Sequence, residues 1–465
     1  MRRLRMTRRN VRMADPRWPA FCHWLEARGG KLRGIVLRTS SRTGTRGLFA
    51  TRDIARGTSV AYIPAAAMLG SPNPRHSWLP WGDGNDSSLA NLACLTYTVL
   101  SEHADPCSPF KPYLDLLEMA PGQAPEPGTP SLVNSLMLPP AAVRAMTRGS
   151  YMEYVHQNLE ERFRDVCRLL SGHPGTDPHL LTGPELLWAF GVVNSRYFGT
   201  HMIPVADAMN MGGEENMRVV QIGGAARERR VGTELVASRD IVAGEELLNS
   251  YESTNVPTPD SVLLCQYGFT MVRNRTNFID VDVPVPREGV TTDFLGPRCA
   301  ECTLVATEKR AVGCEDLSAE SPAACPADLE FGGDGEADAA HLPFLLSARG
   351  RLPCRFLPAV AGTIGASPGS AEARGRARDL LSARLLRYPT TLSADLEWLD
   401  RFEASAVGGG RKLLFAELWG GTETVGLDVY PHLGEWCKAA MGVRIEEKVV
   451  LHRAIKLLRD TGEAG

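Results

Sequence analysis

Two hydrophobic patterns alternate along the chain, one typical of strands and one typical of helices. Short β-prone runs bounded by turn residues predict strands at 34–39, 47–50, 59–64, 217–222, 233–238, 246–251 and 277–283. Apolar residues at helical spacing predict helices at 18–27, 88–101, 110–117, 376–386, 394–404 and 444–459, with one or two charged helices within 141–170. The sequence therefore predicts an α+β protein, in which a helical insertion interrupts a β-rich domain of short strands and a mostly α-helical domain follows.

The changes of pattern give the domain boundaries. Residues 31–280 form the β-rich domain, and the helical insertion occupies about 72–180. Residues 1–30 hold a basic tail and a short helix, and residues 281–465 form the helical C-terminal domain. Within that domain a stretch at about 313–340 is rich in Gly, Ala, Ser and acidic residues, so we expect it to be a loop or disordered insertion.

A short repeat links the two ends of the β-rich domain. The sequence ATRDIARG at 50–57 recurs with few changes as ASRDIVAG at 237–244. In each copy Asp and Gly are placed to make a turn between two strand-like runs. Two similar hairpins about 190 residues apart indicate one β-rich domain that a long insertion divides.

The stretch 181–210 is the strongest site candidate. Thr182 and Glu185 stand at the spacing of a capping box, so a helix is expected to begin here. The helix should end near residues 196–198, because Gly199 follows. It thus delivers an arginine and two aromatic residues into a segment that closes on Asp207 and an asparagine. Aliphatic residues would serve packing alone, so this composition favours a functional site.

Composition narrows the class of function. The chain has 465 residues, 43% of them hydrophobic, and a net charge of −3, which argues against a nucleic-acid coat or a membrane-binding surface. It contains no run of 18 apolar residues, so no spanning helix is expected. Its eleven cysteines are scattered, which favours a reducing intracellular compartment, the cytoplasm or nucleus.

The N-terminus leaves two interpretations open. Six arginines precede the first acidic residue, Asp15. This fits either a disordered basic tail or a signal for import into a chloroplast or mitochondrion. Four cysteines further along are spaced too irregularly for a zinc site, and no metal is expected: Cys299, Cys302, Cys314 and Cys325.

Four segments carry the chemistry: GTRGLFA at 44–50, NSRYF at 194–198, DAMN at 207–210, and GEE at 244–246 leading through Tyr251 to YGF at 267–269. In their order and spacing they resemble the SET-domain methyltransferases, and in particular the subgroup typified by the Rubisco large-subunit lysine methyltransferase. The motifs cover residues 31–280, and only the architecture extends the resemblance to the C-terminus. It implies a SET domain with a helical insertion, followed by a helical substrate-binding domain.

The resemblance also implies a reaction and its residues. The expected cosubstrate is S-adenosylmethionine (AdoMet), and the expected partner is a non-histone protein that presents a lysine side chain. Tyr251 is the implied catalytic residue, which orients the amine and the methyl group. The implied cofactor-binding positions are Gly44, Arg46, Gly47, Arg196, Asn210, Met211, Tyr251 and Phe269. The implied substrate-binding positions are Tyr197, Asp207 and Tyr267. No nucleic-acid or membrane partner is implied, and a monomer is expected.

One position departs from the family pattern. The family usually follows the asparagine with histidine, whereas this chain has Met211. If the main chain makes the contact at this position, methionine can replace histidine with little loss. If the imidazole is needed, the protein is a weak enzyme or a non-catalytic binding module of the same fold. Methylation of histidine instead of lysine is a third, narrower alternative.

Overall fold

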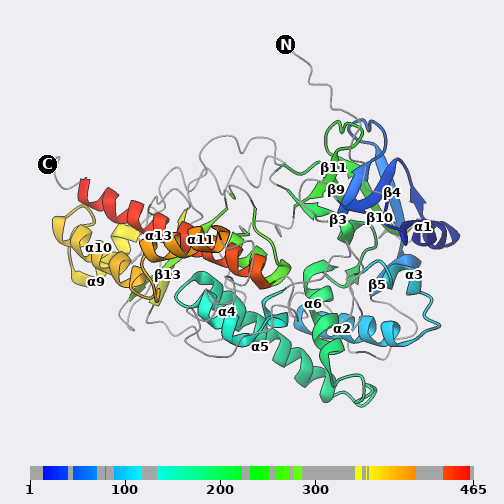
Figure 1. Ribbon diagram of the computed structural model, residues 1–465, viewed down its shortest axis with the longest axis horizontal. Coiled ribbons are helices and arrows are strands. Elements are labelled where there is room, and N and C mark those ends of the chain that lie inside the picture. The colour runs from blue at the N-terminus through cyan, green and yellow to red at the C-terminus, as the bar shows by residue number, and fades with distance from the viewer. Residues whose placement is uncertain are drawn as a thin grey trace, which may run out of the picture. The chain divides into compact units, whose positions relative to one another are not determined.

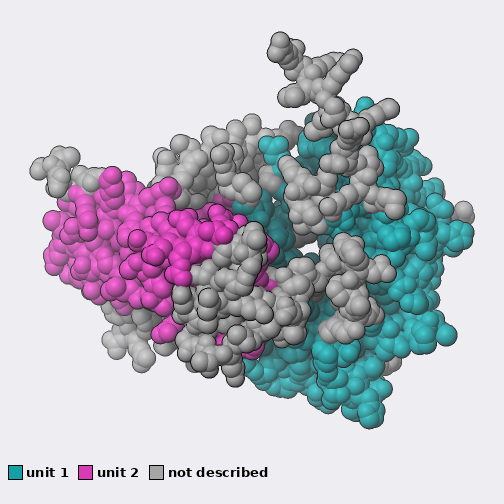
Figure 2. Space-filling model, in the orientation of Figure 1, with its two compact units in different colours: residues 1–137, 158–253, 266–271 teal, residues 138–157, 254–265, 272–465 magenta. Residues whose placement is uncertain are grey.

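The computed structural model describes residues 14–39, 46–70, 79, 88–117, 134–212, 214–222, 231–250, 258–271, 274, 276–284, 341–347, 352, 356–404 and 433–460. The chain forms two compact units, shown in different colours in Figure 2. Unit 1 comprises residues 1–137, 158–253 and 266–271, and unit 2 comprises residues 138–157, 254–265 and 272–465. Each unit is therefore built from segments that are distant in the sequence.

Unit 1 contains the short-stranded sheets. One sheet has the order β1 (Lys31–Leu32), β4 (Ser59–Pro64), β10 (Gly232–Ala237) and β9 (Met217–Ile222), all antiparallel. A second has the order β2 (Ile35–Thr39), β3 (Arg46–Ala50), β11 (Glu246–Asn249) and β8 (Asn210–Met211), in which only the β11–β8 pair is parallel. A third small sheet joins β5 (Leu69–Gly70), β7 (His201–Met202) and β6 (Tyr197–Phe198). Figure 1 shows β3, β4, β9, β10 and β11 gathered together.

The two copies of the repeat meet in space, but they are not hairpins. Strands β3 and β4 flank the first copy and lie in different sheets; β3 pairs with β11 and β4 pairs with β10, the strands that flank the second copy. The backbones of Ile54 and Ile241 exchange two hydrogen bonds, of 2.8 and 2.9 Å. The carboxylate of Asp53 accepts from the Ala243 N–H of the other copy at 2.8 Å. The prediction of hairpins was wrong. An alternation of apolar and polar residues indicates that a segment is a strand, but it does not indicate which strand is its partner.

Helices cover this β structure. They are α1 (Trp18–Ala27), α2 (Ser88–Ala104), α3 (Lys111–Leu114), α6 (Pro184–Arg196) and the part of α5 (Tyr151–Ser171) from residue 158 onward. As predicted, α2 is buried almost all round, and it packs against α6. The predicted capping box is absent: Gly183 is the N-cap of α6, and the Thr182 hydroxyl donates to the His179 carbonyl instead. Thr182 lies one residue too early to cap this helix.

Unit 2 pairs β12 (Phe278–Pro284) with β13 (His341–Ser347) and packs helices around them. These are α4 (Pro140–Thr147), the first turns of α5, α7 (Asp260–Val262), α9 (Phe356–Ile364), α10 (Ala371–Leu385), α11 (Leu392–Ala404) and α13 (Leu433–Asp460). The predicted α+β class with a helical C-terminal region is thus confirmed. The predicted insertion at about 313–340 and the four cysteines at 299–325 lie outside the described residues.

Ion pairs join α11 to α13 in two contrasting surroundings, one buried and one exposed. Asp395 contacts the Lys448 ammonium at 2.5 Å and the Arg444 guanidinium at 3.3 Å, and all three side chains are at most 1% exposed. Glu403 contacts Lys438 at 2.8 Å, with side chains 55% and 41% exposed. Burial lowers the pKa of Lys448, and the hydrogen bond and charge of Asp395 oppose that shift.

Candidate functional site

Asn210 brings three strands of unit 1 together. It is the first residue of β8, which lies parallel to β11 with Asn210 opposite Leu248. Its Nδ2 donates to the main-chain oxygen of Arg46 on β3 at 2.9 Å and to Glu246 Oε1 on β11 at 2.7 Å. Of the predicted cofactor residues, Arg46, Gly47 and Asn210 therefore lie in direct contact. Glu246 was not predicted, although it stands in the GEE segment, because acidic residues after a turn are usually solvated.

Gly47 occupies the tightest point of this arrangement. A Cβ atom at this position would lie 2.4 Å from Glu246 Oε1 and 2.7 Å from Asn210 Nδ2. Real Cβ atoms do not approach other atoms so closely, and only glycine fits without a shift of its neighbours. Gly47 was predicted to bind the cofactor, and the structure adds that the Asn210–Glu246 hydrogen bond occupies the space that a Cβ atom would need.

Asp15 lies beside the side chain of Arg46. Their charged groups are 3.5 Å apart, and both side chains are 7% exposed. Asp15 also accepts from the backbone N–H and the Nε of Arg17, both at 2.9 Å. Burial alone would raise the pKa of Asp15, but the hydrogen bonds and charge of Arg17, together with the charge of Arg46, lower it overall. The carboxylate is therefore ionised at neutral pH. No motif marks Asp15 in the sequence.

Arg196 and Asp207 are joined through the main chain of Asp207. Arg196 ends α6, and its Nη1 donates to the Asp207 carbonyl oxygen. Asp207 lies in the short helix η5 (Ala206–Ala208), where its carboxylate is buried and accepts from the hydroxyl of Tyr113 at 2.5 Å. The structure thus places Asp207 as a residue that fixes this loop. Tyr113 was not predicted, because one tyrosine in a helical insertion carries no signal of its own.

Arg46, Arg196, Asp207 and Tyr113 line one small cavity in unit 1. Its other walls are apolar: Trp18, Phe21, Leu37, Leu116, Leu117, Val205 and Ala208. The cavity volume is about 10 Å³, which has room for about one water molecule and not for a cofactor. Two predicted cofactor arginines, from β3 and from the end of α6, are therefore held at the same buried place.

The three predicted aromatic residues form a second group. The rings of Tyr267 and Phe269 meet edge to face at 6.2 Å. The hydroxyl of Tyr197 accepts from Arg162 Nη2 at 3.4 Å. The pKa of Tyr267 is raised to about 12, mainly by burial; the neighbouring Tyr197 adds to the rise and Arg162 opposes it. Tyr267 therefore keeps its proton at neutral pH and remains a hydrogen-bond donor.

The remaining predicted residues are placed only in part. Met211, the last residue of β8, is half-buried and pairs with Asn249 of β11 through the backbone. Gly44 and the predicted catalytic residue Tyr251 lie outside the described residues. Tyr251 follows β11 by two positions in the sequence.

Among the described residues, no group of three or more His, Cys, Asp or Glu side chains is placed to hold a metal ion. In the same part of the chain, no helix has the length and apolarity needed to cross a membrane.

Comparison with known proteins gives the family of this region. Residues 45–252 match the model of the SET domain. This part of the chain is a SET domain. The match begins in the glycine-rich segment, includes Arg196, Asp207 and Asn210, and ends after Tyr251. Asp15, Tyr267 and Phe269 lie outside the matched span.

Solved structures show the same fold over nearly the whole chain. A crystal structure of the SET domain of LSMT bound to lysine and AdoHcy matches with a TM-score of 0.61 and 15% identity, over 96% of this chain and 92% of that one. Rubisco LSMT bound to sinefungin and monomethyllysine matches with a TM-score of 0.60 and 14% identity, over 97% and 93%. Rubisco LSMT bound to AdoMet matches with a TM-score of 0.59 and 14% identity, over 96% and 92%. No curated protein matches the chain.

Proposed function

We propose that the protein is an AdoMet-dependent protein-lysine N-methyltransferase. The observation that carries the proposal is the convergence of β3 and β8 at Asn210, in a SET domain whose fold resembles that of enzymes solved with AdoMet and with lysine. Arg46 and Gly47 lie at least 163 positions before Asn210 in the sequence. Local sequence alone does not bring them into contact. Binding of a ligand at this place is a functional reason for the contact.

The residues present fit the cofactor. Gly47 supplies a place where main chain can approach a ligand without a Cβ atom in the way. Within the described residues, the hydrogen bonds of Asn210 both use Nδ2, so Oδ1 is the atom that would accept from the cofactor's amino group. Arg196 donates through Nη1 to the Asp207 carbonyl, and a guanidinium group is the planar donor that suits a carboxylate. When bound, AdoMet supplies a methyl group on a cationic sulfur, which a neutral amine displaces in line.

The aromatic group would serve the substrate. Tyr197, Tyr267 and Phe269 would line the path of a lysine side chain with aromatic rings, and such apolar surroundings disfavour its charged form. A neutral amine is the nucleophile that the reaction needs. Tyr267 stays protonated at neutral pH and so adds no negative charge that would hold the ammonium form. Tyr251 would orient the amine toward the methyl group through its hydroxyl.

Isothermal titration with AdoMet, followed by incubation with radiolabelled AdoMet and cell extract, tests the proposal. We expect binding and one or more labelled protein bands, with the label on lysine by mass spectrometry. Arg196→Ala should weaken AdoMet binding, and Tyr251→Phe should remove most turnover while AdoMet still binds. A wild-type chain that binds no AdoMet would refute the proposal. Normal turnover in Tyr251→Phe would show that the catalytic tyrosine has been misassigned.

Met211 motivates a second candidate, a non-catalytic SET-fold binding module that recruits a partner. Such a module need not bind AdoMet, so the same titration separates the two functions. If AdoMet binds and the label lies on histidine, the protein is a histidine methyltransferase of the same fold.

A further inference from the structure

Tyr113 is the one tyrosine whose hydroxyl donates to the carboxylate of Asp207 in the described part of the chain. The O···O distance is 2.5 Å, short even for a bond between a hydroxyl and a carboxylate, and both residues are buried. The main-chain oxygen of the same aspartate accepts from Arg196. Tyr113 therefore holds the residue that in turn holds the predicted cofactor arginine.

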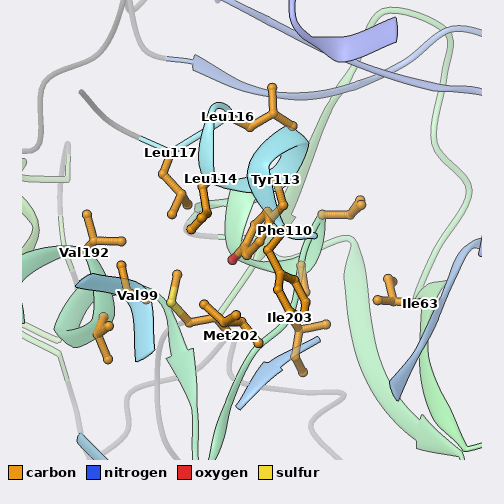
Figure 3. Close-up of a cluster of buried hydrophobic side chains, with 14 of the residues drawn as sticks. Ile63, Val99, Phe110, Tyr113, Leu114, Leu116, Leu117, Val192, Met202 and Ile203 are labelled. Carbon is orange, nitrogen blue, oxygen red and sulfur yellow. The ribbon is translucent and has the colours of Figure 1, made fainter. Parts of the chain in front are cut away.

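The ring of Tyr113 lies in the core of unit 1. Figure 3 shows it among Phe110, Leu114 and Ile203, with its hydroxyl the only oxygen on a labelled side chain. Its ring is 6.4 Å from Trp24, with the planes only 17° apart, and 6.5 Å from Phe21, both on α1. This packing restricts the ring of Tyr113 and so fixes where its hydroxyl oxygen lies.

Helix α1, together with its capping residues Arg17 and Arg28, also holds the backbone on either side of α3. Arg17 donates to the Asp115 carbonyl at 2.6 Å, and Trp24 and Arg28 each donate to the Pro109 carbonyl at 2.7 Å. A four-residue helix such as α3 has little stability alone. The three bonds from α1 fix its position, and the Tyr113 hydroxyl transmits that position to Asp207.

We propose that Tyr113 is a positioning residue of the cofactor site, which acts through Asp207 on Arg196 and is itself held by α1. The inference rests on the proposed function, because it assigns a role in AdoMet binding. Through this role, helix α1 and helix α3 of the insertion contribute to cofactor binding. Without the hydroxyl, the buried carboxylate loses a donor and must turn toward other donors. Arg46 and Arg196 line the same cavity as Asp207. A carboxylate that turned toward these guanidinium groups would draw them from the positions that receive the cofactor.

Tyr113→Phe removes only the hydroxyl, and Tyr97→Phe is its matched control. Tyr97 is equally buried in unit 1, and its hydroxyl accepts from the Asp177 N–H at 2.9 Å, in a loop that holds none of the predicted site residues. Each variant loses a hydrogen bond of the tyrosine hydroxyl, and Tyr113→Phe should lose more thermal stability because its partner is a buried carboxylate. We expect the AdoMet Kd to rise about tenfold in Tyr113→Phe and to stay within about twofold in Tyr97→Phe. KM for AdoMet should rise with Kd, and kcat at saturating AdoMet should change less.

A double variant tests the route through Asp207. If Tyr113 acts through that carboxylate, Tyr113→Phe combined with Asp207→Asn should bind AdoMet no more weakly than the weaker of the two single variants. Additive losses would overturn the route. Should Tyr113→Phe fail to fold, Arg28→Gln removes one of the three hydrogen bonds at a half-buried position, and a rise of about threefold in Kd is then expected.

The outcomes separate this inference from the proposed function. A wild-type chain that binds no AdoMet refutes both. A wild-type chain that binds AdoMet, with the same Kd in Tyr113→Phe and Tyr97→Phe, overturns the positioning role and leaves the proposed function standing.

Discussion

Gly47→Ala tests the geometry around Asn210 most directly. The added Cβ atom would lie 2.4 Å from Glu246 Oε1 and 2.7 Å from Asn210 Nδ2, whereas ordinary contacts begin at 3.4 Å. The two side-chain ends must therefore retreat by about 1 Å and 0.7 Å, and the 2.7 Å bond between them is lost. Both atoms are at the ends of side chains, so the backbone can stay in place. We expect about 1–3 kcal/mol of lost stability from overpacking and from one hydrogen bond to a charged group.

The effect on AdoMet should be larger than the effect on the fold. A displacement of about 1 Å at a binding group can cost about a hundredfold in function. We therefore expect the AdoMet Kd of Gly47→Ala to rise about tenfold to a hundredfold, with thermal unfolding still cooperative. Isothermal titration and a thermal melt measure the two quantities. Gly442→Ala in α13 is the control, because a Cβ there meets no atom within 4 Å and should leave AdoMet binding unchanged. Wild-type affinity in Gly47→Ala would refute the placement of Asn210 in the cofactor site.

Three further predictions follow from other contacts. Asp395→Ala should destabilise the chain by about 3–5 kcal/mol, because it leaves two buried cations without their carboxylate. Glu403→Ala, on the same pair of helices, should cost less than about 1 kcal/mol because its ion pair is exposed. Equal losses of stability in chemical unfolding would contradict this. The lowered pKa of Asp15 stabilises the fold above its unfolded value of about 3.9, and this contribution is lost as pH falls through the folded value. The stability gap between the wild type and Asp15→Asn should thus be about 1–3 kcal/mol at pH 7 and should close as the pH falls through the lowered folded pKa of Asp15, as thermal melts across pH will show. Met211→His should change the AdoMet Kd by less than about threefold, and a gain of tenfold or more would show by titration that the imidazole is needed.

The secondary structure was largely predictable because it depends on local pattern. Each of the seven predicted strand runs contains a strand, and α10, α11 and the second half of α13 fall where helical spacing indicated them. The partners of the strands were not predictable in the same way. The repeat at 50–57 and 237–244 pairs between its copies and not within them, since pairing is decided by packing across the whole unit.

The residues of the candidate site were likewise predictable only in part. Arg46, Gly47 and Asn210 were predicted from motif order, and the structure brings them into contact. Their supports were missed: Asp15, Tyr113 and Glu246 each complete a hydrogen bond or ion pair with a predicted residue. A buried polar group requires some partner and not a particular residue type, so nothing in the local sequence marks the partner.

This asymmetry explains how Met211 can stand where the family has histidine. The backbone of β8 is held by its parallel pairing with β11, in which Met211 lies opposite Asn249, and that pairing does not depend on the side chain at 211. By contrast, the side chain of Asn210 makes two hydrogen bonds, and that of Asp207 accepts one in the core. In such a site, substitution should have little effect on cofactor binding at positions that contribute main-chain atoms. It should weaken binding at positions that contribute side-chain hydrogen bonds. The positions at which substitution should most reduce AdoMet binding are therefore Asn210, Gly47 and Tyr113, whereas Met211 should be the most tolerant. Tyr113 lies outside the four motif segments, in the helical insertion between the first and the second.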